Sequence, residues 1–421
     1  MLVKLNVDLA EKFVKKSIYD STKEKAIEFC RKVYETPEVF QGVNGWFHVN
    51  NATQELDLIK SKAYEVRKNA DVFVIIGVGG SNMAARAVVK ALKNEKSAPE
   101  ILYAGNTMSA HYVKGILDKL KGKSVYINVI AKNFETIEPG SHFRIFRQYL
   151  QERYDRDEVS KRIILTGTKG QLLQEMAEKE GYTFLPFPRA IGGRFSVFSP
   201  VALFPIAVAG LSIDAYIEGA AEVEEHARCC KVDSPIIMYA ALRNCLYAES
   251  FNVEMISAFE PRLEYFLRWW IQMFGESEGK EHKGIFPSGA IYSEDLHAIG
   301  QYVQEGRRSL MESFITIEDP GASLLIKPDD KIQDKFDYLN GKDLAEINKV
   351  VEKATIDAHV KGGVPCFQFR IKKLDEKTFG ALYYFFMVSC VVSGQVLGIN
   401  PFNQEGVEEY KRSMFKLLGR R

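Results

Sequence analysis

A glutamate near the end of an apolar helical stretch is the first residue of this sequence that could do acid–base chemistry. Glu276 stands in the segment QMFGESEGK, four residues after Gln272. Residues four apart share one face of a helix, so we expect both side chains to point to the same place. A carboxylate at a glycine-bounded helix end suits a general base. The alternative interpretation is a solvated glutamate in an acidic run.

An arginine preceded by two glycines supplies a permanent cation. Arg194 follows Gly193 in the segment IGGRFS, just before an apolar run that contains Ser and Pro. Glycine permits the close approach of a ligand to the backbone, and a guanidinium stays charged at physiological pH. The segment therefore indicates an anion-binding arginine. A structural salt bridge is the alternative.

Two more titratable side chains stand in suggestive places. His297 lies in the segment DLHAIG, and Lys411 lies in an amphipathic helix that follows the loop NPFNQEG. Histidine is the side chain best suited to proton transfer near neutrality. Taken singly, His297 could be an interior histidine and Lys411 a surface lysine, so neither residue decides a function.

Two segments that follow apolar runs could bind a phosphate. The first is GVGGS over residues 77–81, whose glycines permit a tight turn before a helix start that attracts anions. A dinucleotide fingerprint needs a glycine at the sixth position, which here is Asn82, so that interpretation fails. The second segment supplies Lys132, Asn133 and Thr136. Both would meet at the carboxyl edge of a parallel sheet, where such folds bind ligands. A plain turn and a solvated lysine are the alternatives.

The elements that must position these residues form an alternating pattern. Short apolar runs predict strands over residues 72–76, 101–104, 125–130, 163–166, 184–187, 253–258, 313–317 and 366–371. Helical segments of about 10–15 residues separate most of them, as in α/β proteins whose parallel sheets are covered on both faces. The sequence therefore predicts two tandem α/β units, over residues 61–195 and 196–400. We expect residues 1–60 to be helical and to pack on the second unit, and residues 401–421 to form a helical tail that carries Lys411.

The composition argues against several classes of partner. The net charge of +1 over 421 residues gives no global field that would favour nucleic acid or a membrane. The six cysteines contain no C-x-x-C pair, which argues against a zinc ribbon and favours reduced thiols in a cytoplasmic protein. Residues 380–399 carry no charge and are long enough to span a bilayer. We favour a buried helix there, because polar residues and glycines interrupt the stretch.

Together, these motifs resemble the phosphoglucose isomerase family, especially its shorter bacterial form. The resemblance is carried by VIIGVGGSNMAARA, GGRFS, FGESEGK and NPFNQEGVEEYK, which occur in the family's order. It implies two sugar-isomerase (SIS-type) α/β domains and the interconversion of glucose 6-phosphate and fructose 6-phosphate through a cis-enediolate. It further implies a small sugar phosphate as partner, no cofactor, no metal and a homodimer.

The resemblance also implies a role for each candidate residue. Glu276 would move the proton between C2 and C1, and Arg194 would stabilise the enediolate oxyanion. His297 and Lys411 would open the sugar ring by proton transfer. The sugar site would be lined by Gly193, Gln272 and Gln404, and the phosphate would be held by Gly80, Ser81, Lys132, Asn133 and Thr136.

One segment departs from the family pattern. Many members have S-K-S-G-T-T where this chain has AKNFET over residues 131–136, so hydroxyls are lost at Ala131 and Asn133. We expect the Asn133 amide to compensate and Glu135 to point away from the phosphate. Arg189 also stands where many members have an acidic residue, and nothing in the sequence explains that change.

Three other functions stay open at this point. The altered segment could broaden the specificity of the isomerase to mannose 6-phosphate. The same α/β domain also serves non-catalytic sugar-phosphate sensors, although a sensor has no need for Glu276. A dehydrogenase is a third alternative, against which the failed dinucleotide fingerprint counts.

Overall fold

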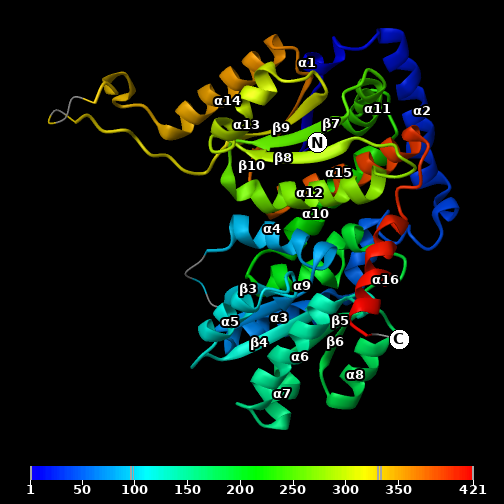
Figure 1. Cartoon of the computed structure of the whole chain (residues 1–421), viewed down its shortest axis with the longest axis vertical. Helices are drawn as coiled ribbons and strands as arrows, with labels where there is room; N and C mark the ends of the chain where they lie inside the picture. Colours follow the sequence, from blue (N-terminus) through cyan, green and yellow to red (C-terminus); the bar gives the residue numbers. More distant parts are fainter. Residues whose placement is uncertain (1, 95–96, 98, 330, 332–333, 420–421) are drawn as a thin grey trace.

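The chain folds into two α/β units stacked along the long axis of the molecule (Figure 1). The computed structural model describes residues 2–94, 97, 99–329, 331 and 334–419, without the side chains of residues 52–54. Each unit contains a five-stranded sheet with parallel strands at its core and helices around it. The predicted α/β fold class is therefore confirmed. The exact boundaries of the two units remain predictions.

The sheet of the first unit is parallel throughout and has the strand order β3-β2-β4-β5-β6. Its strands are β2 (Val72–Ile76), β3 (Glu100–Ala104), β4 (Val125–Ile130), β5 (Ile163–Gly167) and β6 (Thr183–Pro186). Strand β2 is buried on both faces: Phe73 and Ile75 belong to one apolar cluster, whereas Val72, Val74 and Ile76 belong to another. Side chains alternate between faces along a strand, so an unbroken apolar run indicates a sheet covered on both sides.

The helices around this first sheet are α3 (Leu56–Asn69), α4 (Met83–Leu92), α5 (Ala110–Lys119), α6 (Ile137–Gln151), α7 (Arg156–Arg162), α8 (Leu172–Glu180) and α9 (Pro200–Val208). Helix α9 contacts both α3 and α4. A stretch that follows residue 195 in the chain therefore completes the packing of the first unit.

The sheet of the second unit has the order β1-β10-β9-β7-β8, in which only β1 is antiparallel to its neighbour. Its strands are β1 (Lys4–Asn6), β7 (Val253–Ala258), β8 (Phe286–Ile291), β9 (Leu310–Asp319) and β10 (Cys366–Lys373). Its helices are α1 (Asp8–Glu11), α2 (Lys16–Glu35), α10 (Ile213–Arg228), α11 (Pro235–Ala248), α12 (Glu264–Glu278), α13 (Leu296–Glu305), α14 (Leu344–Lys361) and α15 (Glu376–Leu397). Short 3-10 helices are η1 (Pro37–Phe40), η2 (Val49–Glu55), η3 (Gly79–Ser81), η4 (Gly193–Phe198), η5 (Pro261–Leu263), η6 (Asp337–Leu339) and η7 (Glu405–Val407), and α16 (Glu408–Leu417) ends the chain.

Two strands of this sheet were not expected from the sequence. The first residues were predicted to be helical, but β1 pairs with β10 at one edge of the sheet. Strand β1 has only three residues, which is too few for an alternating strand pattern to be recognised in the sequence. Strand β8 forms the other edge, and its sequence FPSGAI contains a proline and a glycine, which disguise a strand.

The apolar helix α15 is the core of the second unit. It is long and apolar enough to cross a membrane, but 83% of its most apolar window is buried inside the molecule. It crosses α10 very closely, since a Cβ at Gly380 would lie 1.8 Å from the carbonyl oxygen of Tyr216. It also contacts α2, α11 and α12. The expected buried helix at residues 380–399 is therefore found from residue 376 to residue 397.

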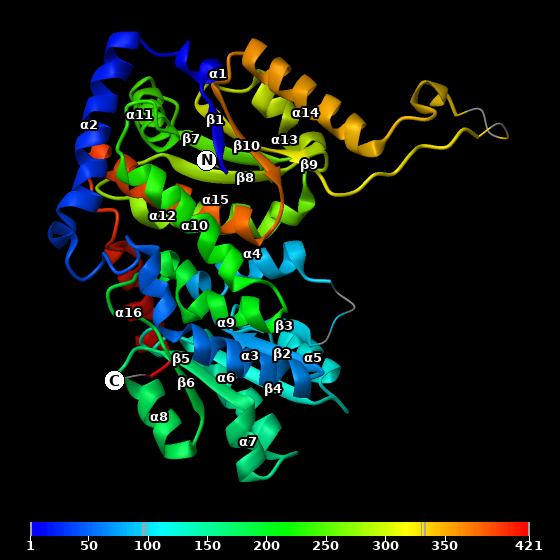
Figure 2. The same ribbon diagram turned by 180° about the vertical axis from the view of Figure 1, so that it is seen from behind.

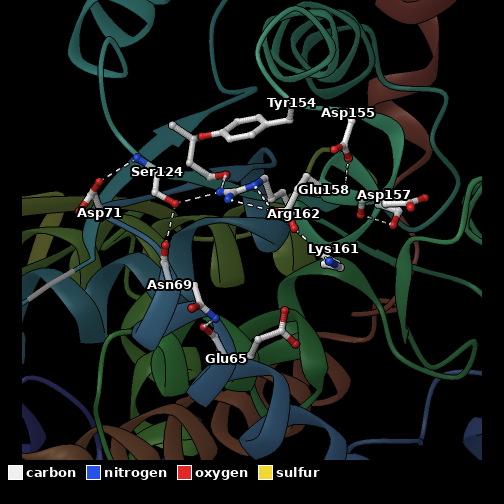
Figure 3. Close-up of polar contacts among 12 residues, drawn as sticks. Glu65, Asn69, Asp71, Ser124, Tyr154, Asp155, Asp157, Glu158, Lys161 and Arg162 are labelled. Carbon is white, nitrogen blue, oxygen red and sulfur yellow. Dashed lines mark hydrogen bonds and ion pairs between the residues drawn. The ribbon is translucent and has the colours of Figure 1, made fainter.

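A polar network closes the amino edge of the first sheet, at the start of β4 (Figure 3). Arg162 donates to the hydroxyl of Ser124 at 2.8 Å and to the carboxylate of Glu158, and it lies over the ring of Tyr154. The backbone of Ser124 donates in turn to Asp71 at 2.8 Å. The network connects α7 to the start of β4, at the edge of the sheet opposite to the carboxyl edge where ligand binding is predicted.

Candidate active site

Two glycine turns of the first unit meet beside Arg194, and Gly79 of one turn faces Gln272 of the second unit. A Cβ added to Gly80 would lie 2.1 Å from the carbonyl oxygen of Gly193, a distance that no real side chain could adopt. Gly79 has a φ of +57° and faces the amide of Gln272, 2.9 Å from where its Cβ would be. Glycine is therefore required at residue 80, because only a bare backbone lets the turn after β2 reach the turn that precedes Arg194.

Arg194 is almost completely buried, at 2% exposure, and every nitrogen of its guanidinium has an acceptor. Its Nε donates to Ser277 Oγ at 2.8 Å, and its Nη1 donates to Gln404 Oε1 at 2.8 Å. Its Nη2 donates to the carbonyl oxygen of Pro401 at 2.6 Å. Burial lowers the pKa of Arg194. These contacts fix the guanidinium plane between α12 and the loop that precedes α16.

Glu276 lies against this guanidinium. Its Oε2 is 3.3 Å from Nη1 of Arg194, and its Oε1 accepts from Nε2 of Gln272 at 3.1 Å. Gln272 and Glu276 are therefore on one face of α12, as their spacing predicts. Gln272 Oε1 is buried and has no hydrogen-bond partner within the described part of the chain, so it is available to accept from a ligand hydroxyl.

A cavity of about 520 Å³ opens beside this cluster. One wall is the end of α12, with Glu276 and Lys280, and the opposite wall is the loop from Asn400 to Val407, with Gln404. The side chain of Glu276 is 33% exposed, so its carboxylate is accessible while its partner Arg194 is not. A small polar ligand could therefore reach an acid–base group that is backed by a fixed positive charge.

The predicted phosphate residues lie at the carboxyl edge of the first sheet. Strands β2 and β4 are parallel neighbours, with Ile76 opposite Val129, so η3 with Ser81 and the segment after β4 leave the sheet side by side. Thr136 stands at the N-cap position of α6 without a side-chain capping bond, and the first-turn N–H groups of this helix could receive an anion. Lys132 donates to the carbonyl oxygen atoms of Arg189 and Ile191 at 3.0 and 2.8 Å, and burial lowers its pKa. Lys132 thus fastens the strand end to the loop before Arg194.

The same segment contains a strained residue. Phe134 has a φ of 42°, in the left-handed region, and its ring packs edge-on against Phe143 of α6 at 5.9 Å. It stands where the family pattern quoted above has glycine. The aromatic contact offsets the cost of placing a side chain in a conformation that glycine adopts freely.

The structure does not bring His297 to Glu276 within one chain. Helix α12 runs antiparallel along β8: Gly275 faces Pro287, and Leu267 faces Gly289. His297 is exposed at the start of α13, beyond the last residue of β8. The two residues are therefore separated by roughly the length of β8, about 17 Å at ~3.3 Å per residue.

Lys411 is on α16, one turn after the loop that supplies Gln404. Its ammonium pairs with Glu408 of the same helix at 2.7 Å, and its side chain is about one-third exposed. The loop from Asn400 to Val407 thus connects Lys411 to the cavity wall.

Comparisons with known proteins identify the family of this chain. A family model described as phosphoglucose isomerase matches residues 31–418. This chain belongs to the phosphoglucose isomerase family. Among its curated relatives, the glucose-6-phosphate isomerases of Staphylococcus saprophyticus and Staphylococcus aureus are each 44% identical over 384 residues, covering 89% of this chain and 87% of the relative.

Solved structures share the phosphoglucose isomerase fold. A hypothetical protein of Thermus thermophilus superposes with a TM-score of 0.89 at 24% identity, and each chain is covered to 99%. A glucose-6-phosphate isomerase of Chlamydia trachomatis superposes with a TM-score of 0.83 at 18% identity, covering 99% of this chain and 88% of that one. At these identities the likeness concerns the fold alone.

Several residues that surround Arg194 and Glu276 were not predicted from the sequence. Ser277 and the carbonyl group of Pro401 bind the guanidinium of Arg194, and Lys280 lies on the cavity wall. Ser277 and Lys280 stand in the same motif as Glu276, which was the available signal. A backbone carbonyl carries no residue-type signal, so the role of Pro401 is visible only in the fold.

Proposed function

We propose that Glu276 is the base and Arg194 the oxyanion-binding cation of an aldose–ketose isomerisation. The chain is an isomerase of the phosphoglucose isomerase family, and its reaction is the interconversion of glucose 6-phosphate and fructose 6-phosphate. The observation that carries the assignment is the 3.3 Å contact between Arg194 Nη1 and Glu276 Oε2 beside an open cavity. A base next to a buried cation is what the abstraction of a weakly acidic proton requires.

In this proposal Glu276 removes the C2 proton of the open-chain aldose. The C–H electron pair forms the C1–C2 double bond, and the negative charge moves onto O1, where Arg194 stabilises it. Glu276 then returns the proton to C1, while the proton of the O2 hydroxyl passes to O1, which gives the C1 hydroxyl and the C2 ketone. No net electrons leave the sugar. Gly193, Gln272 and Gln404 would contact the sugar hydroxyls.

The phosphate end of the substrate would be held away from the reacting carbons. We assign it to Gly80, Ser81, Lys132, Asn133 and Thr136, at the carboxyl edge of the first sheet. Support comes from the parallel neighbours β2 and β4 and from the start of α6. Phosphate binding there would fix the orientation of C1 and C2 against Glu276.

His297 and Lys411 would open the sugar ring by transferring protons at the ring oxygen and O1. Because His297 lies beyond the far end of β8, this role needs a second copy of the chain. We propose a homodimer in which His297 of the partner subunit completes each site. Two segments, residues 320–329 and 334–343, form an arm that supports this proposal: both project from the body in two opposite views (Figures 1 and 2). The arm exposes the apolar side chains of Leu324, Leu325, Phe336 and Tyr338, which favours a contact with another molecule.

A coupled assay of the purified chain tests the reaction. We expect turnover of millimolar fructose 6-phosphate in the presence of EDTA, detected by oxidation of the glucose 6-phosphate formed. In Glu276→Gln, exchange of the C2 proton with deuterated solvent should stop while the substrate still binds. Wild-type protein without turnover refutes the function, and a fully active Glu276→Gln refutes the choice of base.

A mixing experiment tests the shared site. Glu276→Gln and His297→Ala should each be inactive alone. After unfolding and refolding together, half of the dimers should be mixed, and each mixed dimer should have one intact site of two. The mixture should therefore recover about a quarter of the wild-type activity, as isologous pairing predicts. No recovery, or a monomer in sedimentation analysis, contradicts the proposal. We also propose a cytoplasmic location, which cell fractionation would test.

A further inference from the structure

Lys280 lines the cavity, but the proposed mechanism assigns no role to it. It follows Gly279, the C-cap residue of α12, and its ammonium turns back onto the helix. Its Nζ donates to the carbonyl oxygen atoms of Glu276 and Ser277, each at 2.7 Å. These carbonyls belong to the last turn of α12, where the helix itself offers no N–H donor.

The same two residues make the decisive contacts with Arg194. Ser277 Oγ accepts from its Nε at 2.8 Å, and Glu276 Oε2 lies 3.3 Å from its Nη1. Gln272 holds the other oxygen of Glu276. The carboxylate is therefore fixed by two side chains, whereas the backbone that carries it is fixed by Lys280. A displacement of about 1 Å in a reacting group can lower a rate by about 100-fold.

We propose that Lys280 is a positioning residue for the base: its ammonium fastens the last turn of α12 and thereby holds Glu276 and Ser277 in their working places. The inference rests on the proposed isomerase function and deepens it. Two of the three N–H groups of the ammonium go to the carbonyls. The side chain also lines the cavity, so its protonation can follow the pH of the solvent.

The charged and titratable groups around Lys280 come from η4, α12, α15, η7 and the segment that follows α12. Burial lowers the pKa of Lys280 to about 8, and the nearby Arg194 lowers it too, whereas the Cys390 thiol of α15 and the carboxylates of Glu276 and Glu278 oppose the shift. Glu281 and Glu405 line the same cavity. The ammonium is therefore present below about pH 8 and is lost above it, together with its charge and one donor. An arginine at this position would keep its charge.

Three variants test the proposal against wild-type enzyme. Lys280→Met removes the charge and the donors but keeps the length of the side chain. Lys280→Arg keeps a cation that can reach both carbonyls. Lys283→Met is the matched control, because Lys283 is three residues further on and pairs with the exposed Glu281. We measure kcat and KM for fructose 6-phosphate from pH 6 to pH 9.5, together with thermal unfolding.

The expected result is a split between kcat and KM. Lys280→Met should lose kcat by about tenfold or more, with KM changed by less than about threefold, as for a base that is displaced while substrate contacts remain. Lys280→Arg should keep kcat within about threefold of wild type, and the decline of wild-type activity above pH 8 should be absent from it. Lys283→Met should match wild type in every measurement.

The proposal is overturned if Lys280→Met keeps kcat within twofold of wild type, or if Lys280→Arg shows the same decline above pH 8 as wild type. A loss of folded protein in Lys280→Met is recognised by its unfolding curve, and the pH profile of Lys280→Arg then decides. Wild-type protein that fails to convert fructose 6-phosphate refutes the isomerase function instead. An active wild type with an equally active Lys280→Met refutes only the role of Lys280.

Discussion

Two arginine–glutamate clusters flank the last turns of α12, and they differ in exposure rather than in chemistry. In the first, Arg194 meets Glu276, whose side chain is one-third exposed at the cavity. In the second, Arg243 binds Glu254 of β7 at 2.7 Å and also binds Glu278, and all three side chains are fully buried. The comparison teaches that residue type alone does not mark a catalytic pair. A carboxylate must be reachable to move a substrate proton, whereas a sealed ion pair can only fasten elements together.

The buried Arg243 cluster connects several elements of the second unit. Arg243 also donates to Ser393 Oγ of α15 at 2.6 Å and lies over the ring of Phe274 in α12. It therefore joins α11, β7, α12 and α15 beneath the turn that carries Glu276. One cation faces two carboxylates, and burial raises the pKa of Glu278.

The same substitution in both clusters gives the largest expected contrast. Arg194→Lys should lower kcat by about 10²–10³-fold, since a lysine cannot replace a planar fork that stabilises a developing oxyanion. Its melting temperature should fall by only a few degrees. Steady-state kinetics and a thermal melt check both expectations, and a kcat within fivefold of wild type would contradict the role of Arg194.

Arg243→Lys should show the opposite behaviour. The ammonium cannot satisfy Glu254, Glu278 and Ser393 at once, so buried acceptors are left unpaired. We expect the free energy of unfolding to fall by about 2–4 kcal/mol, measured by urea denaturation. The folded fraction should keep a KM close to that of wild type. An unchanged free energy of unfolding would show that the buried Arg243 cluster does not stabilise the fold.

Ser277→Ala tests the connection between the two clusters, because Ser277 stands between Glu276 and Glu278 in sequence. Loss of one hydrogen bond to a charged group is worth about 1.5–3 kcal/mol. If that bond orients Arg194 for the transition state, kcat should fall by about tenfold or more, and KM should change little. A change confined to KM would instead assign Ser277 to substrate binding.

The smallest effect is expected from Glu278→Gln. The pKa of Glu278 is raised in the folded state, so its ionised form lowers stability above the folded pKa, and this cost is relieved as the pH falls towards the unfolded value. Glutamine imitates the protonated form. We therefore expect unfolding free energy at pH 7 to change by less than about 1 kcal/mol, with a flatter pH dependence between pH 4.5 and 7. A large loss at pH 7 would show that the second carboxylate is needed as an anion.

The sequence predicted the parts of this design that are local. The spacing of Gln272 and Glu276 on one helix face, the glycine turn at residues 77–81 and the buried strands all follow from short-range patterns, and the structure has them.

What could not be predicted depends on long-range pairing. Arg243 lies in an apolar helix, and no sequence pattern near it predicts an ion pair with Glu254 or Glu278. Pro287 and Gly289 are unusual in a strand, so β8 was not predicted. Because β8 separates His297 from Glu276, the distance between these two residues was not predicted either. The bond from Lys132 to the loop before Arg194 joins residues 57 and 59 positions apart through backbone carbonyls.

The contacts of Arg194 have a consequence for how this enzyme can be divided. Arg194 belongs to the predicted first unit, whereas Ser277 and Glu276, which it contacts, belong to the second, so the halves cannot swing apart on a hinge without breaking these contacts. A gene cut between the halves should therefore give two fragments that are each inert, and reassociation of the fragments should restore the pocket only when Arg194 again meets Ser277 and Glu276.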